Sequence, residues 1–295
     1  FAATLIPAPR TTLHHDTIRR VRTELDKLER KQLLLKQELA ESQNAETHRL
    51  FADLLMANLH RVHAGQKSAI VTDYFSEKPD GTLSEMELSL DPALSPMENV
   101  QRYYKKYSRA KRAQEQIQAQ IRQCLEDIHY LETVALPLND NVTNQEIQEI
   151  IQELADSGYI QLGKKSRNFS RPSEPRHICL PSGAVIFIGR NNRQNDMVTF
   201  KTAQPRDLWF HTKDIPGSHV ILRTGSAVPQ ISDIEKAAHL AAWFSKARNS
   251  ANVPVDYTER RHVKKPAGAK PGFVIYEKQK TLWVTPDEES VNALL

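Results

Sequence analysis

The sequence is poor in cysteine and glycine and has no long apolar run. Two cysteines, Cys124 and Cys179, occur in 295 residues, which excludes a disulfide framework and suggests a reducing compartment. No apolar run approaches the roughly 18 residues that a membrane span requires. The ten glycines form neither a Walker motif nor a dinucleotide-binding motif. The chain begins with Phe1 and shows no leader segment, so we expect a piece of a longer protein.

Charge is divided unevenly along the chain. Residues 1–163 contain 19 basic and 24 acidic side chains, a net charge of −5, whereas residues 164–295 contain 21 and 12, a net charge of +9. The formal total of +4 conceals this difference. An excess of this size favours nucleic acid as a partner over the alternative, an ordinary solvated surface.

The N-terminal half shows the alternating three- and four-residue spacing of a coiled coil. One apolar stripe begins after Asp16 and ends at Gly65, and a second runs from Val100 to Ala135, where Leu136-Pro137 stops it. We therefore predict an antiparallel helical hairpin over residues 1–136. A parallel coil between two chains is the alternative, but the return helix supplies a partner within the chain. The first seam contains Ile18, Val21, Leu25, Leu28, Leu35 and Leu39.

Between the two helices the period changes to that of strands. Residues 69–75 and 83–90 alternate apolar and polar side chains and are joined through Pro79-Asp80-Gly81, which predicts a β-hairpin insertion near 69–90. A short helical linker follows over residues 137–163. Its helix is predicted by the capping-box pattern from Thr143 to Glu146 and ends at Gly158.

The last part of the chain, residues 164–295, mixes strand and helix patterns. Residues 163–175 are polar and loop-like, and one helix is predicted around residues 234–244. Mixed strands around one or two helices predict a compact α+β domain, so the fold class of the whole chain is α+β. The predicted strands are 177–180, 184–188, 208–211, 219–222, 253–257, 273–276 and 282–285.

The segment Asp207–His219 gathers aromatic, histidine and acidic side chains around a Pro-Gly turn. Strand alternation puts Leu208 and Phe210 on one face and Trp209 and His211 on the other. Two interpretations explain the segment equally well. One is a site near the turn, where His211 and Lys213 converge with Ser218 and His219. The other is a hairpin whose aromatic rings belong to the core. The triad Asp207, His211 and Ser218 lacks a nucleophile elbow and an oxyanion loop, and no zinc ligand set is present. We expect no enzyme activity, no metal and no cofactor.

Basic residues recur in the C-terminal domain beside amides and aromatic rings. They lie in the segments 189–195, 245–249, 260–266 and 268–272, the last two of which we interpret as a charged loop. Lysine and arginine neutralise phosphates, amides contact base edges, and an aromatic ring such as Trp209 stacks a base. A second basic group follows one side of the return helix, near the far end of the predicted hairpin. A solvated helix face and a phosphate-binding tip remain equal alternatives for this group: Arg102, Lys105, Lys106, Arg109 and Arg112.

Several long motifs resemble one known family. The runs GRNNRQND, DLWFHTKDIPGSHV and AAWFSKARNSANVPVDYTERRHVKKPAGAKPG are similar to the RNA-binding domain of NFACT proteins, and DPALSPMENVQRYYKKYSRAKRA resembles their coiled-coil and middle region. The resemblance covers residues from about Thr12 to Pro286. The implied group is that of the bacterial RqcH/FbpA-type proteins, which are relatives of eukaryotic NEMF.

The resemblance implies a cytoplasmic protein that binds the large ribosomal subunit, its rRNA and stalk base, and tRNA. Such proteins act in ribosome quality control on stalled peptidyl-tRNA and recruit tRNA for C-terminal tailing. The tRNA-selecting N-terminal domain is absent from this sequence, so we do not expect the chain to elongate peptides alone. The RNA-binding candidates implied by position are Arg190, Asn191, Asn192, Asp207, Trp209, His211, Lys213, His219, Lys246, Arg248, Lys264, Lys265 and Lys270.

The resemblance also implies an alternative function. Members of the same group are described as surface adhesins that bind host fibronectin or fibrinogen, although they lack an export signal. Location at the cell surface is therefore a second expectation. Nothing in the composition or spacing of the residues indicates fibronectin binding.

Overall fold

The computed structural model describes residues 12–42, 45–77, 82–140, 142–161 and 172–295. Its contacts divide the chain into two compact units. One unit comprises residues 29–126, and the other comprises residues 1–28 together with 127–295. This division runs through the long helices and not between the hairpin and the C-terminal domain, so each unit is described by itself.

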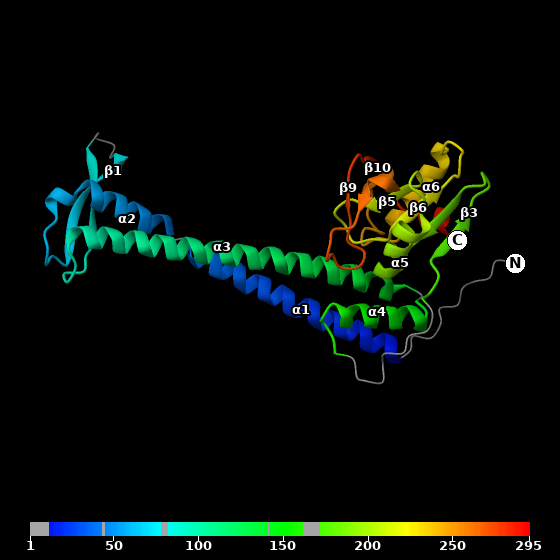
Figure 1. Ribbon diagram of the computed structural model, residues 1–295, viewed down its shortest axis with the longest axis horizontal. Helices are drawn as coiled ribbons and strands as arrows, with labels where there is room; N and C mark the ends of the chain where they lie inside the picture. The colour runs from blue at the N-terminus through cyan, green and yellow to red at the C-terminus, as the bar shows by residue number, and fades with distance from the viewer. Residues whose placement is uncertain (1–11, 43–44, 78–81, 141, 162–171) are drawn as a thin grey trace. The chain divides into compact units, whose positions relative to one another are not determined.

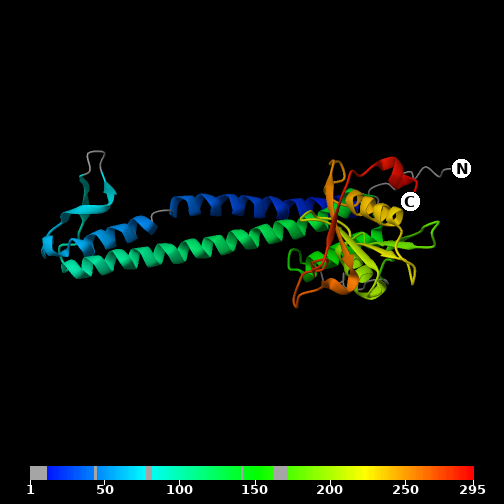
Figure 2. The same cartoon turned by 90° about the horizontal axis from the view of Figure 1, so that it is seen from above.

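Two long helices supply the coiled coil of the first unit. Helix α1 spans Thr12–Glu41 and α3 spans Pro96–Ala135, and within this unit they lie side by side (Figures 1 and 2). The seam residues Leu35, Ile117 and Cys124 are buried, as their heptad positions predict. The helical prediction is confirmed in both stretches. The first apolar stripe, however, belongs to two helices, because α2 (Ala45–Ala57) begins anew after α1.

A small two-stranded sheet packs against α2 and the start of α3. Strands β1 (Ser68–Glu77) and β2 (Leu83–Ser89) pair antiparallel, which confirms the predicted hairpin. Its inner face buries Ala69, Val71 and Leu88 against α2 and α3. The predicted turn at residues 79–81 lies outside the described residues.

The second unit contains a helical base. Here the first half of α1 and the end of α3 pack with α4 (Asn144–Asp156) around a cluster that includes Val21, Leu131, Ile147 and Leu154. The capping box is confirmed, since the Glu146 amide donates to the Thr143 hydroxyl at 3.2 Å and the Thr143 amide donates to the Glu146 carboxylate at 2.8 Å. A 3₁₀ turn over Leu136–Asn139 ends the run of α3.

A six-stranded antiparallel sheet forms the C-terminal domain, in the order β10-β7-β5-β6-β4-β3. One face carries the main core with α6 (Ile231–Trp243) and α7 (Glu288–Asn292). The other face carries a smaller cluster that contains Trp209. The strands are β3 (Arg176–Cys179), β4 (Val185–Ile188), β5 (Leu208–Thr212), β6 (Val220–Arg223), β7 (Val253–Glu259) and β10 (Lys280–Val284). The α+β class is confirmed, and so are the two faces of β5, because Phe210 joins one cluster and Trp209 the other.

Two segments of this domain differ from the prediction. Residues 189–195 were expected only to follow a strand, but they lead into α5 (Asn192–Met197) and a π-helix (Val198–Thr202). The local cause is Asn191, whose side chain accepts a hydrogen bond from the Gln194 amide at 2.8 Å and so caps the helix. The prediction of a charged loop at 260–266 was wrong in part, because Val263–Lys264 forms β8 and pairs with β9 (Ile275–Tyr276).

Candidate nucleic-acid interface

Three glutamates on one side of α4 face the C-terminal domain. Glu146, Glu149 and Glu153 are spaced by three and four residues, so they share one face of the helix. Their exposed fractions are 3%, 7% and 1%. A buried carboxylate is costly unless it is hydrogen-bonded or paired with a cation. The residues that supply those partners are the amide-rich segment singled out in the sequence.

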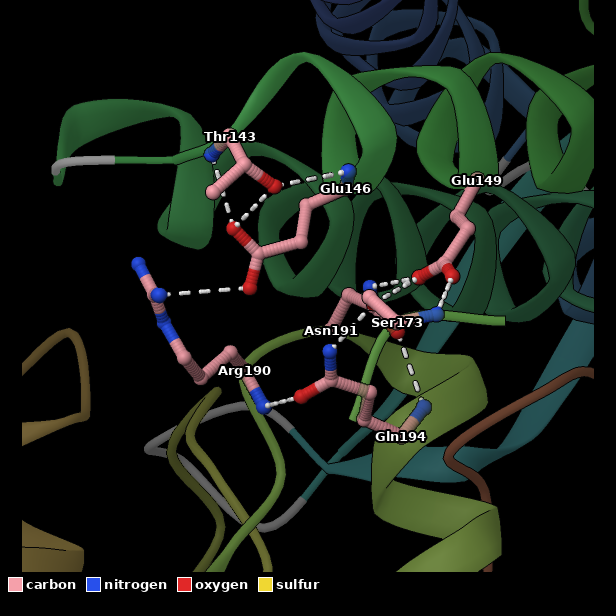
Figure 3. Close-up of polar contacts among 7 residues, drawn as sticks. All are labelled: Thr143, Glu146, Glu149, Ser173, Arg190, Asn191 and Gln194. Atoms are coloured by element: carbon pink, nitrogen blue, oxygen red, sulfur yellow. Dashed lines mark hydrogen bonds and ion pairs between the residues drawn. The ribbon is translucent and has the colours of Figure 1, made fainter. Parts of the chain in front are cut away.

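Glu146 pairs with the first residue of that segment. An oxygen of its carboxylate lies 3.2 Å from a guanidinium nitrogen of Arg190 (Figure 3). The other oxygen accepts the capping-box bond from Thr143. The backbone amide of Arg190 donates to the side chain of Gln194 at 2.9 Å. Arg190 is therefore held at both its backbone and its side chain.

Glu149 collects three hydrogen bonds. Its carboxylate accepts from the backbone amide of Ser173 at 2.5 Å, from the Ser173 hydroxyl at 2.7 Å and from the Asn191 amide group at 2.8 Å (Figure 3). Gln194 donates to the Ser173 hydroxyl at 2.7 Å and completes the network. We name the contacts of Glu146, Glu149 and Glu153 with residues 190–192 the carboxylate clasp.

Glu153 occupies the most buried position of the carboxylate clasp. It accepts hydrogen bonds from the Tyr130 hydroxyl at 2.9 Å and from the Asn192 side chain at 2.8 Å. Burial disfavours the charged form and raises the pKa of Glu153 to about 7, although both hydrogen bonds act in the opposite direction. This carboxyl therefore titrates near neutral pH.

This titration predicts a loss of stability between about pH 5 and about pH 8. A carboxyl with a raised pKa in the folded state favours folding while it stays protonated, and this contribution disappears as the pH rises through that pKa. From the size of the shift we expect a loss on the order of 3 kcal/mol in the free energy of unfolding. Urea unfolding followed by tryptophan fluorescence measures it, because Trp209, Trp243 and Trp283 all lie in the C-terminal domain.

Glu153→Gln is the matched control for this titration, because glutamine is neutral throughout. Burial lowers the pKa of His211 and His219, so their protonation destabilises the fold as the pH falls and opposes the effect of Glu153. Only the difference between the wild type and Glu153→Gln therefore isolates the carboxyl. Equal pH dependence in the two proteins would contradict the assignment.

Further candidate cations lie in ion pairs within the same unit. Arg248 pairs with Asp140 at 2.9 Å and lies 4.7 Å from the centre of the Trp243 ring. Lys246 pairs with Glu132 at 2.5 Å, and Lys270 pairs with Asp127 at 2.6 Å.

Lys265, Lys264 and Lys213 are arranged differently. Lys265 pairs with Asp196, and Lys264 lies 3.4 Å from Glu277 in a pair that is 65% exposed on both sides. Lys213 is exposed. The ion pairs of Arg248, Lys246 and Lys270 therefore join the domain to its helical base, whereas those of Lys265 and Lys264 lie within the domain. Direct RNA contact by any of these residues remains a prediction.

The buried Trp209 and His219 form one aromatic cluster with the half-buried His211. Trp209 has no exposed surface, and its ring lies 5.7 Å from that of His211, 5.2 Å from that of His219 and 4.8 Å from that of Tyr276. Burial lowers the pKa of His211 to about 4 and that of His219 well below its usual value. Both rings are therefore neutral at pH 7 and offer no charge to a phosphate. In this arrangement Trp209 is core and presents no ring face to a base.

The cations of α3 lie on the first unit. Arg102 approaches Asp91 at 3.7 Å, and Lys106 lies 5.4 Å from the centre of the buried Tyr103 ring. Lys105, Arg109 and Arg112 are exposed, and within the described part of the chain no ion pair involves them. Tyr103 donates to the Ser89 carbonyl at 2.6 Å and so connects this helix face to the small sheet.

The role of the three α4 glutamates was not predicted from the sequence. Their spacing and their position beside Ile147, Ile150 and Leu154 were visible, and three acids bordering an apolar stripe indicate a face that needs polar partners. Over the residues that the structure describes, no group of three or more histidine, cysteine or acidic side chains could hold a metal ion. Within the same residues, no helix has the length and apolar character to cross a membrane.

Comparison with known proteins assigns both halves of the chain. Residues 9–172 match the NFACT N-terminal and middle domains, and residues 178–278 match the NFACT protein RNA binding domain. The Rqc2 homolog RqcH of Streptococcus suis is 40% identical over 280 residues, which cover 95% of this chain and 49% of that protein. The Rqc2 homolog RqcH of Bacillus subtilis is 41% identical over 262 residues, covering 87% and 44%. The chain spans about half the length of these curated relatives.

A solved structure has the same fold. The C-terminal part of the fibronectin/fibrinogen-binding protein from Streptococcus suis aligns with a TM-score of 0.74 at 35% identity, covering 95% of this chain and 97% of that one. Coiled-coil domain-containing protein 25 of Bos taurus shares 31% identity over 120 residues, which is 39% of this chain and 57% of that protein. The match to the NFACT N-terminal and middle domains alone covers more than half of the chain. The chain therefore belongs to the NFACT family.

Proposed function

We propose that this chain is the RNA- and ribosome-binding part of an RqcH-type quality-control factor. The observation that carries the proposal is the match of residues 178–278 to the NFACT RNA binding domain. Residues 164–295, which include this match, have a net charge of +9. Phosphate contacts dominate the affinity of proteins for nucleic acid, and a basic domain supplies them.

The cations that serve this role best are those that the fold leaves unpaired. Lys201, Arg206 and Lys213 are exposed, and in the described ranges no ion pair involves them. Arg190, the cation of the carboxylate clasp, is paired with Glu146 and holds the domain against α4 instead. In our proposal the chain engages large subunits that hold stalled peptidyl-tRNA and supports tRNA recruitment for C-terminal tailing. It does so by binding, without a catalytic group of its own, in the cytoplasm.

The cations of α3 have a separate role in this proposal. Lys105, Arg109 and Arg112 contact the stalk base of the large subunit, while the C-terminal domain contacts RNA. The support for this division is the exposure of these side chains on one helix and the similarity of the chain to RqcH proteins.

Salt dependence tests the ribosome-binding proposal. We expect co-sedimentation with large ribosomal subunits to weaken at least about a hundredfold between about 50 and about 200 mM salt, because each phosphate contact releases counterions. The measurement is the bound fraction over a salt series. An affinity for subunits and for tRNA that stays constant over this range would contradict the proposal.

A second candidate is binding of fibronectin or fibrinogen. The observation in its favour is the solved Streptococcus suis structure, whose protein is named for that binding. A solid-phase fibronectin assay on the same sample tests it. Capture that survives Lys264→Glu and Lys265→Glu but disappears on deletion of residues 14–136 would favour a protein partner over RNA.

A further inference from the structure

A groove of about 570 Å³ opens beside the carboxylate clasp. One wall comes from α5 and the π-helix, through Arg193, Met197, Phe200 and Lys201, and the other lining residues include Lys265 and Pro271. Its volume lies within the range of about 300–1,000 Å³ that is usual for small-ligand sites. This groove could not be predicted from local sequence patterns, because its lining residues come from separate parts of the chain.

The π-helix shapes this wall. The Ala203 amide donates to the Val198 carbonyl at 2.9 Å, five residues back, and this wide turn is rare and concentrated at functional sites. Val198 and Thr199 are fully buried, whereas Phe200 and Lys201 line the groove. Arg260 supports Phe200: its side chain donates to the Thr199 carbonyl at 2.7 Å, and its guanidinium lies 5.1 Å from the centre of the Phe200 ring.

The charges in the groove favour an anion. Its carboxylates are already engaged, since Glu149 accepts the three hydrogen bonds of the clasp and Asp196 pairs with Lys265 and accepts from the Gly272 amide at 3.2 Å. Lys201 is exposed, and no ion pair within the described residues involves it. Arg193 pairs with Asp156, and the side chains of this pair are 37% and 57% exposed. An incoming phosphate therefore meets cations that solvent can reach.

We propose that this groove binds an unpaired nucleotide of single-stranded RNA. The base stacks on Phe200 beside Met197, and the flanking phosphates lie at Lys201 and Arg193. Base stacking on an aromatic ring and phosphate pairing with lysine are the two components of single-strand recognition. The inference rests on the proposed RNA-binding function and names the site at which an unpaired base is held.

The test uses the whole chain and two fluorescein-labelled probes. One is an oligouridylate of about eight nucleotides, and the other is an abasic ribose-phosphate strand of the same length. We expect Phe200→Leu to weaken oligouridylate binding about tenfold, as the removal of one base stack predicts, and to leave the abasic strand within about twofold. Lys201→Glu weakens both probes, because it removes a phosphate contact. Fluorescence anisotropy measures the affinities.

Lys280→Glu is the matched control. Lys280 is an exposed lysine of β10 that does not line the groove, so the same change of charge there should alter both affinities less than about twofold. A thermal melt verifies that Phe200→Leu remains folded. Lys201 is exposed, so Lys201→Glu should leave the fold intact, and its effect on RNA affinity does not depend on a change of packing.

Crosslinking separates failure of the groove from failure of the proposed function. An oligouridylate that carries 5-iodouridine should crosslink to the peptide that contains Met197 and Phe200. Wild-type RNA binding with crosslinks elsewhere, or equal losses in Lys201→Glu and Lys280→Glu, would overturn the groove and leave the RNA-binding proposal standing. An absence of binding to RNA and to large subunits in the wild type would overturn both.

Discussion

Replacing Trp209 by alanine should lower the free energy of unfolding of the C-terminal domain by about 3–5 kcal/mol. The indole has no exposed surface and lies among the rings of His211, His219 and Tyr276. Its removal therefore leaves a cavity in a cluster that the surrounding strands cannot refill. Urea unfolding followed by circular dichroism and by the fluorescence of the remaining tryptophans measures the change.

Two variants accompany this measurement. Trp283→Ala is the matched control, because the Trp283 side chain is 67% exposed and its removal should cost less than about 1 kcal/mol. Trp209→Phe retains an aromatic ring. The indole nitrogen of Trp209 has no hydrogen-bond partner among the described atoms. Trp209→Phe therefore removes side-chain volume but breaks no hydrogen bond.

The Trp209 variants also separate the two interpretations of the Asp207–His219 segment. If Trp209 is core, Trp209→Phe binds RNA as the wild type does. If Trp209 stacks a base, Trp209→Ala stays as stable as the wild type and loses RNA affinity. That second result would contradict the burial of the ring.

The second large effect is expected at the carboxylate clasp. Arg190→Ala should destabilise the C-terminal domain by about 3 kcal/mol, because it leaves the Glu146 carboxylate, whose side chain is 4% exposed, without its cation. Tryptophan fluorescence during urea unfolding measures the loss. Lys264→Ala is the matched control, since both members of the Lys264–Glu277 pair are 65% exposed and such pairs contribute less than about 1 kcal/mol.

Salt dependence then distinguishes a structural Arg190 from one that binds RNA directly. If Arg190 neutralised a phosphate, Arg190→Ala would reduce the slope of log affinity against log salt by about 1. We expect no change of slope under conditions in which the variant is folded, because the clasp already uses the guanidinium. An unchanged stability together with a reduced slope would show that Arg190 belongs to the RNA interface.

Local sequence patterns predicted the elements of this protein well. The heptad spacing from Val100 to Ala135 predicted α3 up to its last residue, and Thr143 with Glu146 predicted the start of α4. Period-two alternation also placed Phe210 and Trp209 on opposite faces of β5. These features depend on neighbours within a few residues, so the pattern alone carries them.

The candidate site was predicted less well. Arg190, Asn191 and Asn192 were predicted as RNA-binding candidates, and their partners on α4, which lie about 40 residues earlier in the chain, were not predicted. Asn191, for example, meets Glu149 across 42 residues, and Asn192 meets Glu153 across 39. The spacing of residues within a segment does not indicate which distant part of the chain will pack against it.

The sequence by itself determined the longer helices, most of the strands, the basic character of residues 164–295 and the family. Each of these depends on periodicity, composition or long matching motifs. The tertiary structure alone decided which cations are engaged and which are free. A buried carboxylate needs a partner when two faces pack together, and Arg190 supplies it for Glu146. Arg248 and Lys270 pair with the half-buried Asp140 and Asp127, whereas Lys201 is left exposed. The groove beside Phe200 likewise exists only once α5, the π-helix and Pro271 are brought together.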